Sequence, residues 1–232
     1  VPAAARSSRR PDGQDLPLKD ISMLTLYSMP SSGNSYKVRL LLALLGRPYR
    51  HVDAEYGSGV TETADFRALN PAGKVPLLVL EDGRLLSESN AILLYLARGT
   101  RFLPDDAYEQ ALCHQWMFFE QNSHETSVAV RAAILTYPQR AHLRTPENLD
   151  PLLESGNRAL SIMEIQLART PYLTGNALTV ADLCLFGYTH SAGAKGGYDM
   201  DRFPAIGSWL ERIAAEPGYV PLTFIPEAQA NS

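Results

Sequence analysis

The pattern of apolar and polar positions changes character near residue 100. Residues 24–28 (LTLYS) alternate as a β-strand does, and a polar, turn-forming stretch follows at 30–35 (PSSGNS). Apolar residues then recur at helical spacing through YKVRLLLALLG, and Pro48 opens a second strand-like segment, PYRHVD. The pattern predicts a strand, a loop, a helix and a strand in this order, which is a βαβ unit.

A hairpin and a short helix are predicted after a polar segment at residues 54–69. The apolar runs VPLLVL and RLLS flank Asp82-Gly83, and Asp-Gly between apolar runs is a strong hairpin signal. From Ser87 onward, apolar positions predict a helix that ends near Gly99. The order βαβ and then ββα is that of the thioredoxin fold, so we predict an α/β thioredoxin-like domain over residues 23–99.

Strand signals fade after residues 100–105, which we interpret as a linker. The segments beyond it are compatible with helices and are separated by Pro and Gly: 106–136, 147–169, 179–192 and 204–215. We predict an all-helical second domain over residues 106–232. Residues 1–22 hold Arg, Ser, Pro and Gly without an apolar period, and we interpret them as a flexible N-terminal arm.

Composition and charge narrow the functional class. The chain has 232 residues, 45% of them hydrophobic, and a formal net charge of −4. This balance argues against a nucleic-acid-binding surface, and no apolar run is long enough to span a bilayer. The two cysteines, Cys113 and Cys184, exclude a disulfide scaffold and fit a reducing compartment. The scattered histidines show no metal-ligand spacing, so we expect a cytoplasmic protein without a metal.

Pro76 stands inside the apolar run 75–80, where a proline would remove a hydrogen bond of the sheet. A cis Val75–Pro76 bond at the start of the strand resolves this conflict, and an ordinary trans proline at a strand edge is the alternative. Further along, Glu88 and Ser89 open the helix that runs to Ala97. Exposed N–H groups at a helix start bind anions, although simple capping also favours a serine there.

A third motif, TGNALTVADLCLFGY, places Thr179 and Asp182 as a Thr-x-x-Asp capping box ahead of an apolar helix. Its role is folding. Together with the loop PSSGNS, the Val75-Pro76 pair and the Glu88-Ser89 pair, this motif resembles the cytosolic glutathione transferase family. The resemblance covers Met23 to about Phe224 and is to bacterial members with a serine-type loop like that of the theta and zeta classes.

The resemblance implies a glutathione site in the first domain. The Val75 backbone, followed by Pro76, would pair with the cysteinyl part of glutathione like an added strand. The Ser89 hydroxyl and N–H would hold the γ-glutamyl carboxylate, and Glu88 would face the ammonium group. Lys74 could contact the glycyl carboxylate. Lys37 and Lys74 are each more often solvated surface charges.

The resemblance also places a thiol-activating residue in the loop before the first helix. Ser32 matches the serine of theta- and zeta-like members, and Ser31 and Asn34 compete with it because either could reach the sulfur. A hydrogen-bond donor there would stabilise the thiolate and lower the thiol pKa. Tyr27 comes too early in the predicted strand to be the thiol-activating residue. The SSGNS stretch lacks the Ser-Ser-Cys of zeta members, so zeta-type isomerase activity is not expected.

The resemblance implies that the protein is a glutathione transferase that acts in detoxification. It would form a homodimer and add glutathione to a small hydrophobic electrophile bound between the two domains. Arg131 could bind an anionic group on that substrate. A glutathione-dependent peroxidase or disulfide reductase remains an alternative, as does a non-catalytic interaction module. The loop has no cysteine, which argues against dithiol chemistry by the protein. The candidate walls of the electrophile pocket are Met29, Trp116, Phe119, Arg131 and Tyr137.

Overall fold

The computed structural model describes residues 23–226. Within them, four strands form one mixed sheet in the order β2-β1-β3-β4. Strand β1 runs parallel to β2 and antiparallel to β3, and β3 and β4 form the predicted hairpin around Gly83. The thioredoxin-like fold is therefore confirmed. The strands are β1 (Thr25–Ser28), β2 (Arg50–Asp53), β3 (Leu77–Val79) and β4 (Leu85–Ser87).

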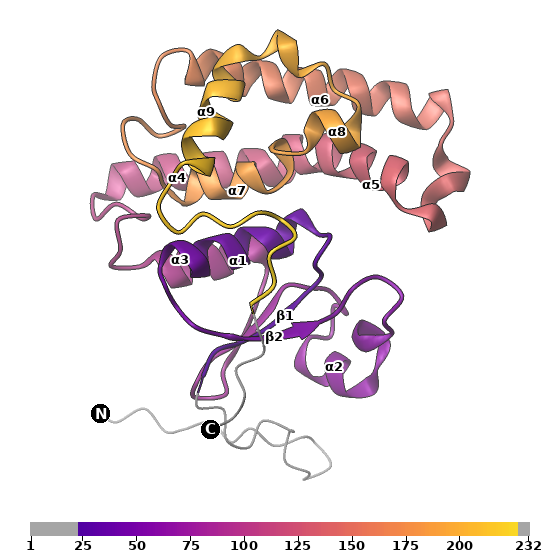
Figure 1. Cartoon of the computed structure of the whole chain (residues 1–232), viewed down its shortest axis with the longest axis vertical. Helices are drawn as coiled ribbons and strands as arrows, with labels where there is room; N and C mark the ends of the chain where they lie inside the picture. Colours follow the sequence, from indigo (N-terminus) through magenta and orange to yellow (C-terminus); the bar gives the residue numbers. More distant parts are fainter. Residues whose placement is uncertain (1–22, 227–232) are drawn as a thin grey trace.

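Two helices separate the sheet from the second domain, and Figure 1 shows them between the strands and the upper layer of helices. They are α1 (Gly33–Leu44) and α3 (Ser89–Ala97). Helix α1 begins earlier than its apolar pattern indicated, because Ser32 is its N-cap. The segment interpreted only as polar contains η1 (Val60–Glu62) and α2 (Ala64–Leu69), a helix that buries only two side chains and so gives a weak periodic signal.

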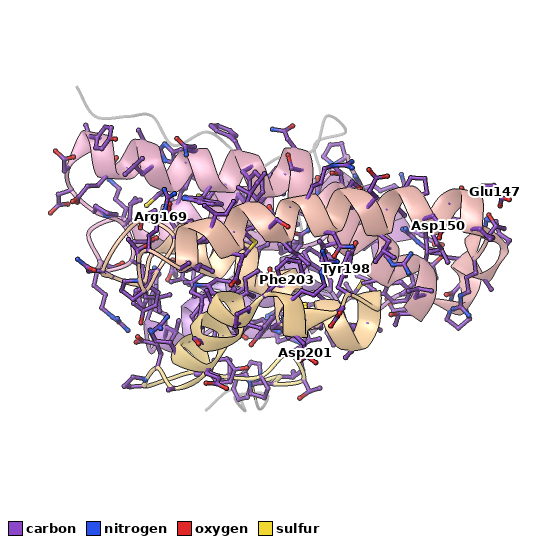
Figure 2. All side chains as sticks on the ribbon, turned by 90° about the horizontal axis from the view of Figure 1, so that it is seen from above. Glu147, Asp150, Arg169, Tyr198, Asp201 and Phe203 are labelled. Carbon is purple, nitrogen blue, oxygen red and sulfur yellow. The ribbon has the colours of Figure 1, made fainter. Side chains whose placement is uncertain are left out.

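The second domain is helical, as predicted. Figure 2 shows α6 lying across it, with Glu147 and Asp150 toward one end of the helix and Arg169 beyond the other. Its elements are α4 (Ala107–Phe119), η2 (Glu120–Ala129), α5 (Val130–Thr136), η3 (Pro138–Leu143), α6 (Pro146–Leu167), α7 (Val180–Thr189), α8 (Ala192–Gly196), η4 (Met200–Arg202) and α9 (Pro204–Ala214). The predicted N-terminal arm lies outside the described residues.

The capping box predicted at Thr179 is present at the start of α7. The buried Asp182 carboxylate accepts hydrogen bonds from the backbone N–H of Leu173 at 2.8 Å and of Thr179 at 2.9 Å, and from the Trp209 indole at 3.0 Å. It therefore joins α7 to the preceding loop and to α9. Burial raises the pKa of Asp182, and these donors oppose that shift.

The chain beyond α9 returns to the first domain, passing beside α1 and α3 (Figure 1). Tyr36 donates its hydroxyl hydrogen to the Val220 carbonyl at 2.7 Å, and the buried Arg39 guanidinium donates to the Leu222 carbonyl at 2.8 Å. Between residues 23 and 226, none of the helices has the length and apolar character that crossing a bilayer requires.

A buried ion pair joins the two domains. Lys37 of α1 donates to Glu120, the first residue of η2, at 2.8 Å, and both side chains are fully buried. The residue type of Lys37 suggested a solvated surface charge, but the side chain is buried in an ion pair. Burial opposes the charge on Lys37, yet the neighbouring Cys184 and Glu120 raise the pKa of this lysine overall.

We predict that Lys37→Met destabilises the protein by about 3–5 kcal/mol, because it leaves the Glu120 carboxylate buried without a cation. Urea unfolding would show a lower midpoint at an unchanged slope. The double variant Lys37→Met/Glu120→Gln should recover most of this loss, since the uncompensated charge is gone.

The matched control is Arg158→Met, which breaks the exposed Arg158–Glu154 pair on α6. It should cost less than about 1 kcal/mol, as exposed ion pairs do. A similarly small loss in Lys37→Met, or a double variant no more stable than the single one, would contradict the assignment.

Candidate functional site

The loop between β1 and α1 is held rigidly by side chains on both of its flanks. Arg39 donates to the Ser28 hydroxyl at 2.6 Å and to the Pro30 carbonyl at 2.8 Å, and the Met29 N–H donates to the Ser35 hydroxyl at 3.0 Å. Gly33 follows directly. A Cβ on Gly33 would lie 2.5 Å from the Tyr188 ring, so glycine is required for the approach of α7.

Two pockets flank this loop. One, the polar pocket, has a volume of about 130 Å³ and lies over the edge of β4, the start of α3 and η2. The other, the aromatic pocket, has a volume of about 210 Å³ and lies against α5, η3 and α7. Ser32 and Gly33 line the aromatic pocket, and the next residue, Asn34, lines the polar one. The loop therefore forms a wall common to both.

The polar pocket brings together the residues that sequence analysis assigned to glutathione. Lys74, Val75, Pro76, Glu88 and Ser89 all line it. The Val75–Pro76 peptide bond is cis, as predicted. Ser89 is buried at the first position of α3, where the free N–H groups of the helix point outward. Such a helix start is suited to a carboxylate.

Glu88 has an unusual backbone conformation. Its φ is 70°, and among the non-glycine residues of the described chain only Glu88 has a positive φ. A non-glycine residue in this region is strained and is found preferentially at functional sites. The side chain is exposed at the pocket, where its carboxylate can meet a cationic group of a ligand.

Asn34 connects the polar pocket to the second domain. Its side-chain carbonyl accepts hydrogen bonds from Lys37 at 2.7 Å and from the Ser89 hydroxyl at 3.0 Å. Its amide donates to Glu125 of η2 at 2.6 Å. Glu125 also lines the pocket and accepts from Gln121 at 2.7 Å. Burial raises the pKa of Glu125, and the Lys37 ammonium opposes the shift.

The winding of η2 places its two carboxylates on α1. A π-helix bonds residue i to residue i+5, so Glu120 and Glu125 return to a common face. In an α-helix, residues five apart would point about 140° away from each other. Here Glu120 binds Lys37 while Glu125 binds Asn34, which stands one turn earlier on α1. Sequence analysis missed Glu125, because no helix periodicity would pair it with Glu120.

Ser31 has no hydrogen-bond donor left for a ligand. Its hydroxyl donates to Glu55 at 2.7 Å, and its N–H donates to the same carboxylate at 2.9 Å. Since a hydroxyl has one proton and the carboxylate takes it, the Tyr137 hydroxyl at 2.8 Å must be the donor to Ser31. Ser31 therefore braces the loop against the segment after β2 and against the start of η3.

Ser32 is the serine whose hydroxyl proton no carboxylate takes. As N-cap of α1, its oxygen accepts a long hydrogen bond from the Ser35 N–H at 3.4 Å, a contact that leaves its own proton unused. The Tyr188 phenol lies beside it on α7. Burial raises the pKa of Tyr188 to about 12, although hydrogen bonding to Ser32 works in the other direction. Tyr188 stays protonated and is a second hydrogen-bond donor at the loop. Sequence analysis placed Tyr188 only in the motif TGNALTVADLCLFGY, to which it gave a folding role.

Three residues that were expected to line the electrophile pocket do not line the aromatic pocket: Trp116, Phe119 and Arg131. Trp116 packs in the core against Phe119, with ring centroids 5.3 Å apart. Arg131 donates to the Gly196 and Leu149 carbonyls at 2.7 and 2.6 Å, so its charge is used in joining helices. Met29 and Tyr137 do line the aromatic pocket, as expected. Trp116 does not reach the aromatic pocket because it belongs to α4, before η2, and its side chain is buried in the interior.

Both cysteines are buried. Cys184 donates to the Asn90 carbonyl oxygen at 3.1 Å and to Glu120 at 3.3 Å, and burial raises its pKa well above the usual value. Neither Cys113 nor Cys184 lines the two pockets. In the described part of the chain, no three His, Cys, Asp or Glu side chains gather as a metal site would require. Thiol chemistry at this site would need a sulfur from a ligand.

Comparison with known proteins identifies the family. Residues 22–98 match the family described as "Glutathione S-transferase, N-terminal domain", and residues 127–217 match "Glutathione S-transferase, C-terminal domain". Glutathione S-transferase 3 of Zea mays is 31% identical over 89% of this chain and 99% of its own length. Disulfide-bond oxidoreductase YfcG of Escherichia coli is 28% identical over 84% of this chain and 92% of its own.

The fold agrees with this assignment. The crystal structure of a glutathione S-transferase from Pseudomonas fluorescens Pf-5 is 44% identical, with a TM-score of 0.83 over 87% of this chain and 99% of that one. The identity, the coverage of both domains and the arrangement of the two pockets all lead to one conclusion. The chain belongs to the glutathione S-transferase family.

Proposed function

We propose that the protein is a glutathione transferase that binds glutathione in the polar pocket and adds it to an electrophile in the aromatic pocket. The observation that carries the proposal is the position of residues 32–34 between the two pockets. A sulfur at this wall would be within reach of a donor on the loop and would face the second substrate. Positioning two reactants in adjoining pockets is itself a large part of catalysis.

Glutathione would lie with its cysteinyl part along Val75, its γ-glutamyl carboxylate at the start of α3 and its ammonium group toward Glu88. The Ser89 N–H suits the carboxylate, and the Ser89 hydroxyl would turn to it from the neutral Asn34 carbonyl, because a charged acceptor makes the stronger hydrogen bond. Glu125 adds a second carboxylate to the ammonium side, supplied by the helical domain of the same chain. Lys74 is exposed at the rim and suits the glycyl carboxylate.

Ser32 would stabilise the thiolate by donating its hydroxyl proton, which no carboxylate takes, to the sulfur. The thiol proton leaves to solvent, the sulfur forms a bond to the electrophilic atom, and a leaving group departs or a double bond takes up the electron pair. Asn34 is the weaker candidate, because its amide already donates to Glu125 and its carbonyl accepts twice. Ser31 has no donor available.

Disulfide reduction is a second candidate, since a relative with 28% identity is named a disulfide-bond oxidoreductase. The same thiolate would attack a disulfide sulfur instead of carbon, with a second glutathione completing the exchange. Turnover of a small dialkyl disulfide, compared with that of a chloronitroaromatic, separates the two activities. Absence of both activities, with glutathione still bound, would favour a non-catalytic module.

Homodimer formation stays a prediction, as do a cytoplasmic location and a role in detoxification. Tyr95 of α3 and Phe118 of α4 are exposed aromatic side chains, with exposed fractions of 44% and 67%. Burial of such side chains is a usual source of stability in dimers.

We predict that Ser32→Ala raises the thiol pKa of bound glutathione by about one unit, because the charge-assisted hydrogen bond to the thiolate is lost. At a pH below both pKa values the thiolate fraction and kcat for a chloronitroaromatic should fall roughly tenfold. The thiolate absorbance, titrated with pH on the complex, measures the pKa directly.

Ser31→Ala is the matched control. It removes a neighbouring hydroxyl whose proton is already given to Glu55, so the thiol pKa should stay within a few tenths of the wild-type value. An unchanged pKa in Ser32→Ala would reject Ser32 as the activating residue. A shift in Asn34→Ala alone would transfer the role to Asn34.

We also predict that Ser89→Ala raises the Kd for glutathione roughly tenfold, because a hydrogen bond to a charged carboxylate is lost. The value of kcat at saturating glutathione should stay within about twofold, since the interaction is made equally in the ground state and the transition state. Calorimetric titration and steady-state kinetics measure the two. Ser208→Ala, on the exposed surface of α9, should change neither. An unaltered Kd in Ser89→Ala would refute the assigned orientation of glutathione.

A further inference from the structure

The aromatic pocket carries two cationic side chains that a neutral electrophile would not use. Lys195 of α8 and Arg140 of η3 both line it, and no carboxylate does. Among residues 23–226, neither side chain takes part in an ion pair. His190 also lines the pocket, but burial lowers its pKa, so it is neutral near pH 7. The pocket therefore has a net positive wall.

The Lys195 ammonium is only partly solvated. Burial lowers its pKa, and the charge of Glu55 works in the opposite direction. Glu55 forms no ion pair with Lys195, and its oxygens accept from the Ser31 hydroxyl at 2.7 Å, the Ser31 N–H at 2.9 Å and the Tyr56 N–H at 3.0 Å. An anion that enters the pocket would replace the hydration that Lys195 has lost.

The remaining walls suit a flat apolar body. Tyr56 and Tyr137 stack with ring centroids 5.9 Å apart and planes inclined by 27°. Three alanines of the η2–α5 region, Ala129, Ala132 and Ala133, also line the pocket and leave room for a ring. Aromatic faces of this kind favour offset stacking with a planar ligand.

We propose that the aromatic pocket selects aromatic electrophiles that carry a carboxylate or a comparable anion, with Lys195 and Arg140 binding that anion. This proposal rests on the proposed function, and it names the class of the second substrate. Arg131, which sequence analysis considered for an anionic group, is replaced in this role by two residues from α8 and η3, segments for which the sequence showed no binding signal.

The reaction can be written for nucleophilic aromatic substitution on a chloronitroarene. The glutathione sulfur forms a bond to the ring carbon, the carbon–chlorine bond breaks, chloride leaves with the electron pair, and the thiol proton passes to solvent. A carboxylate para to the chlorine takes no part in this balance. Its interaction with Lys195 and Arg140 would orient the ring and raise its affinity.

The test compares 4-chloro-3,5-dinitrobenzoate with the neutral 4-chloro-3,5-dinitrobenzamide, each kcat/KM being divided by the uncatalysed rate constant with glutathione. We expect the benzoate to be favoured about tenfold by the wild-type protein, and less at high salt, which screens exposed charges. Lys195→Met and Arg140→Met should each reduce this preference, and the double variant should abolish it while the benzamide value stays within about twofold. Arg158→Met removes a remote charge of α6 and should leave the preference intact.

Binding of the two reaction products, the S-aryl glutathione conjugates with a carboxylate or a carboxamide, separates this proposal from the proposed function. A tighter Kd for the carboxylate conjugate that disappears in the double variant supports the proposal even if turnover is absent, in which case only the transferase chemistry fails. Equal Kd values for the two conjugates, with glutathione itself bound, overturn the proposal and leave the transferase intact. Absence of binding by glutathione and by both conjugates overturns both.

Discussion

The buried ion pair between Lys37 and Glu120 holds the helical domain against the sheet domain, beside the packing of α1 on α7. A charged pair without water is stable only in good geometry, so it admits little sliding between α1 and η2. Asn34 shares Lys37 with Glu120 and donates to Glu125, and thereby couples the loop to the same contact. The polar pocket is lined by residues of both domains, with Gln121 and Glu125 of η2 near Ser89 at the start of α3.

The π-helical winding of η2 is the conformation that this contact requires. Two carboxylates five residues apart reach two α1 residues that are three apart, which an α-helical η2 could not achieve. The winding also places Gln121 between the carboxylates, where it donates to Glu120 at 2.8 Å and to Glu125 at 2.7 Å. The Gln121 amide donates to both acidic groups and so limits their repulsion, which lets both lie near the cation of α1.

Much of the first domain was predictable because its signals are local. An Asp-Gly turn, a proline inside a strand and a serine at a helix start each constrain the chain within a few residues, and the structure has a hairpin, a cis Val75–Pro76 bond and α3 at these places. What joins the domains was not predictable. Lys37 was interpreted as a surface charge, since nothing near it in the sequence shows that Glu120 will cover it. Tyr188 and Glu125 reach the loop only through tertiary packing, and α2 was too short to show a period.

Substitutions in the two pockets should differ in their effect on stability, because the residues of the two pockets differ in their contacts with the rest of the protein. Asn34 binds Glu125 and Ser89 through hydrogen bonds and also accepts one from Lys37, so a change in Asn34 disturbs the junction of the domains. Lys195 and Arg140 stand on short segments, α8 and η3, and carry no ion pair within the described residues. Their charge can change without unfolding the core, so the proposed specificity for the second substrate would be separable from stability and from the proposed binding of glutathione.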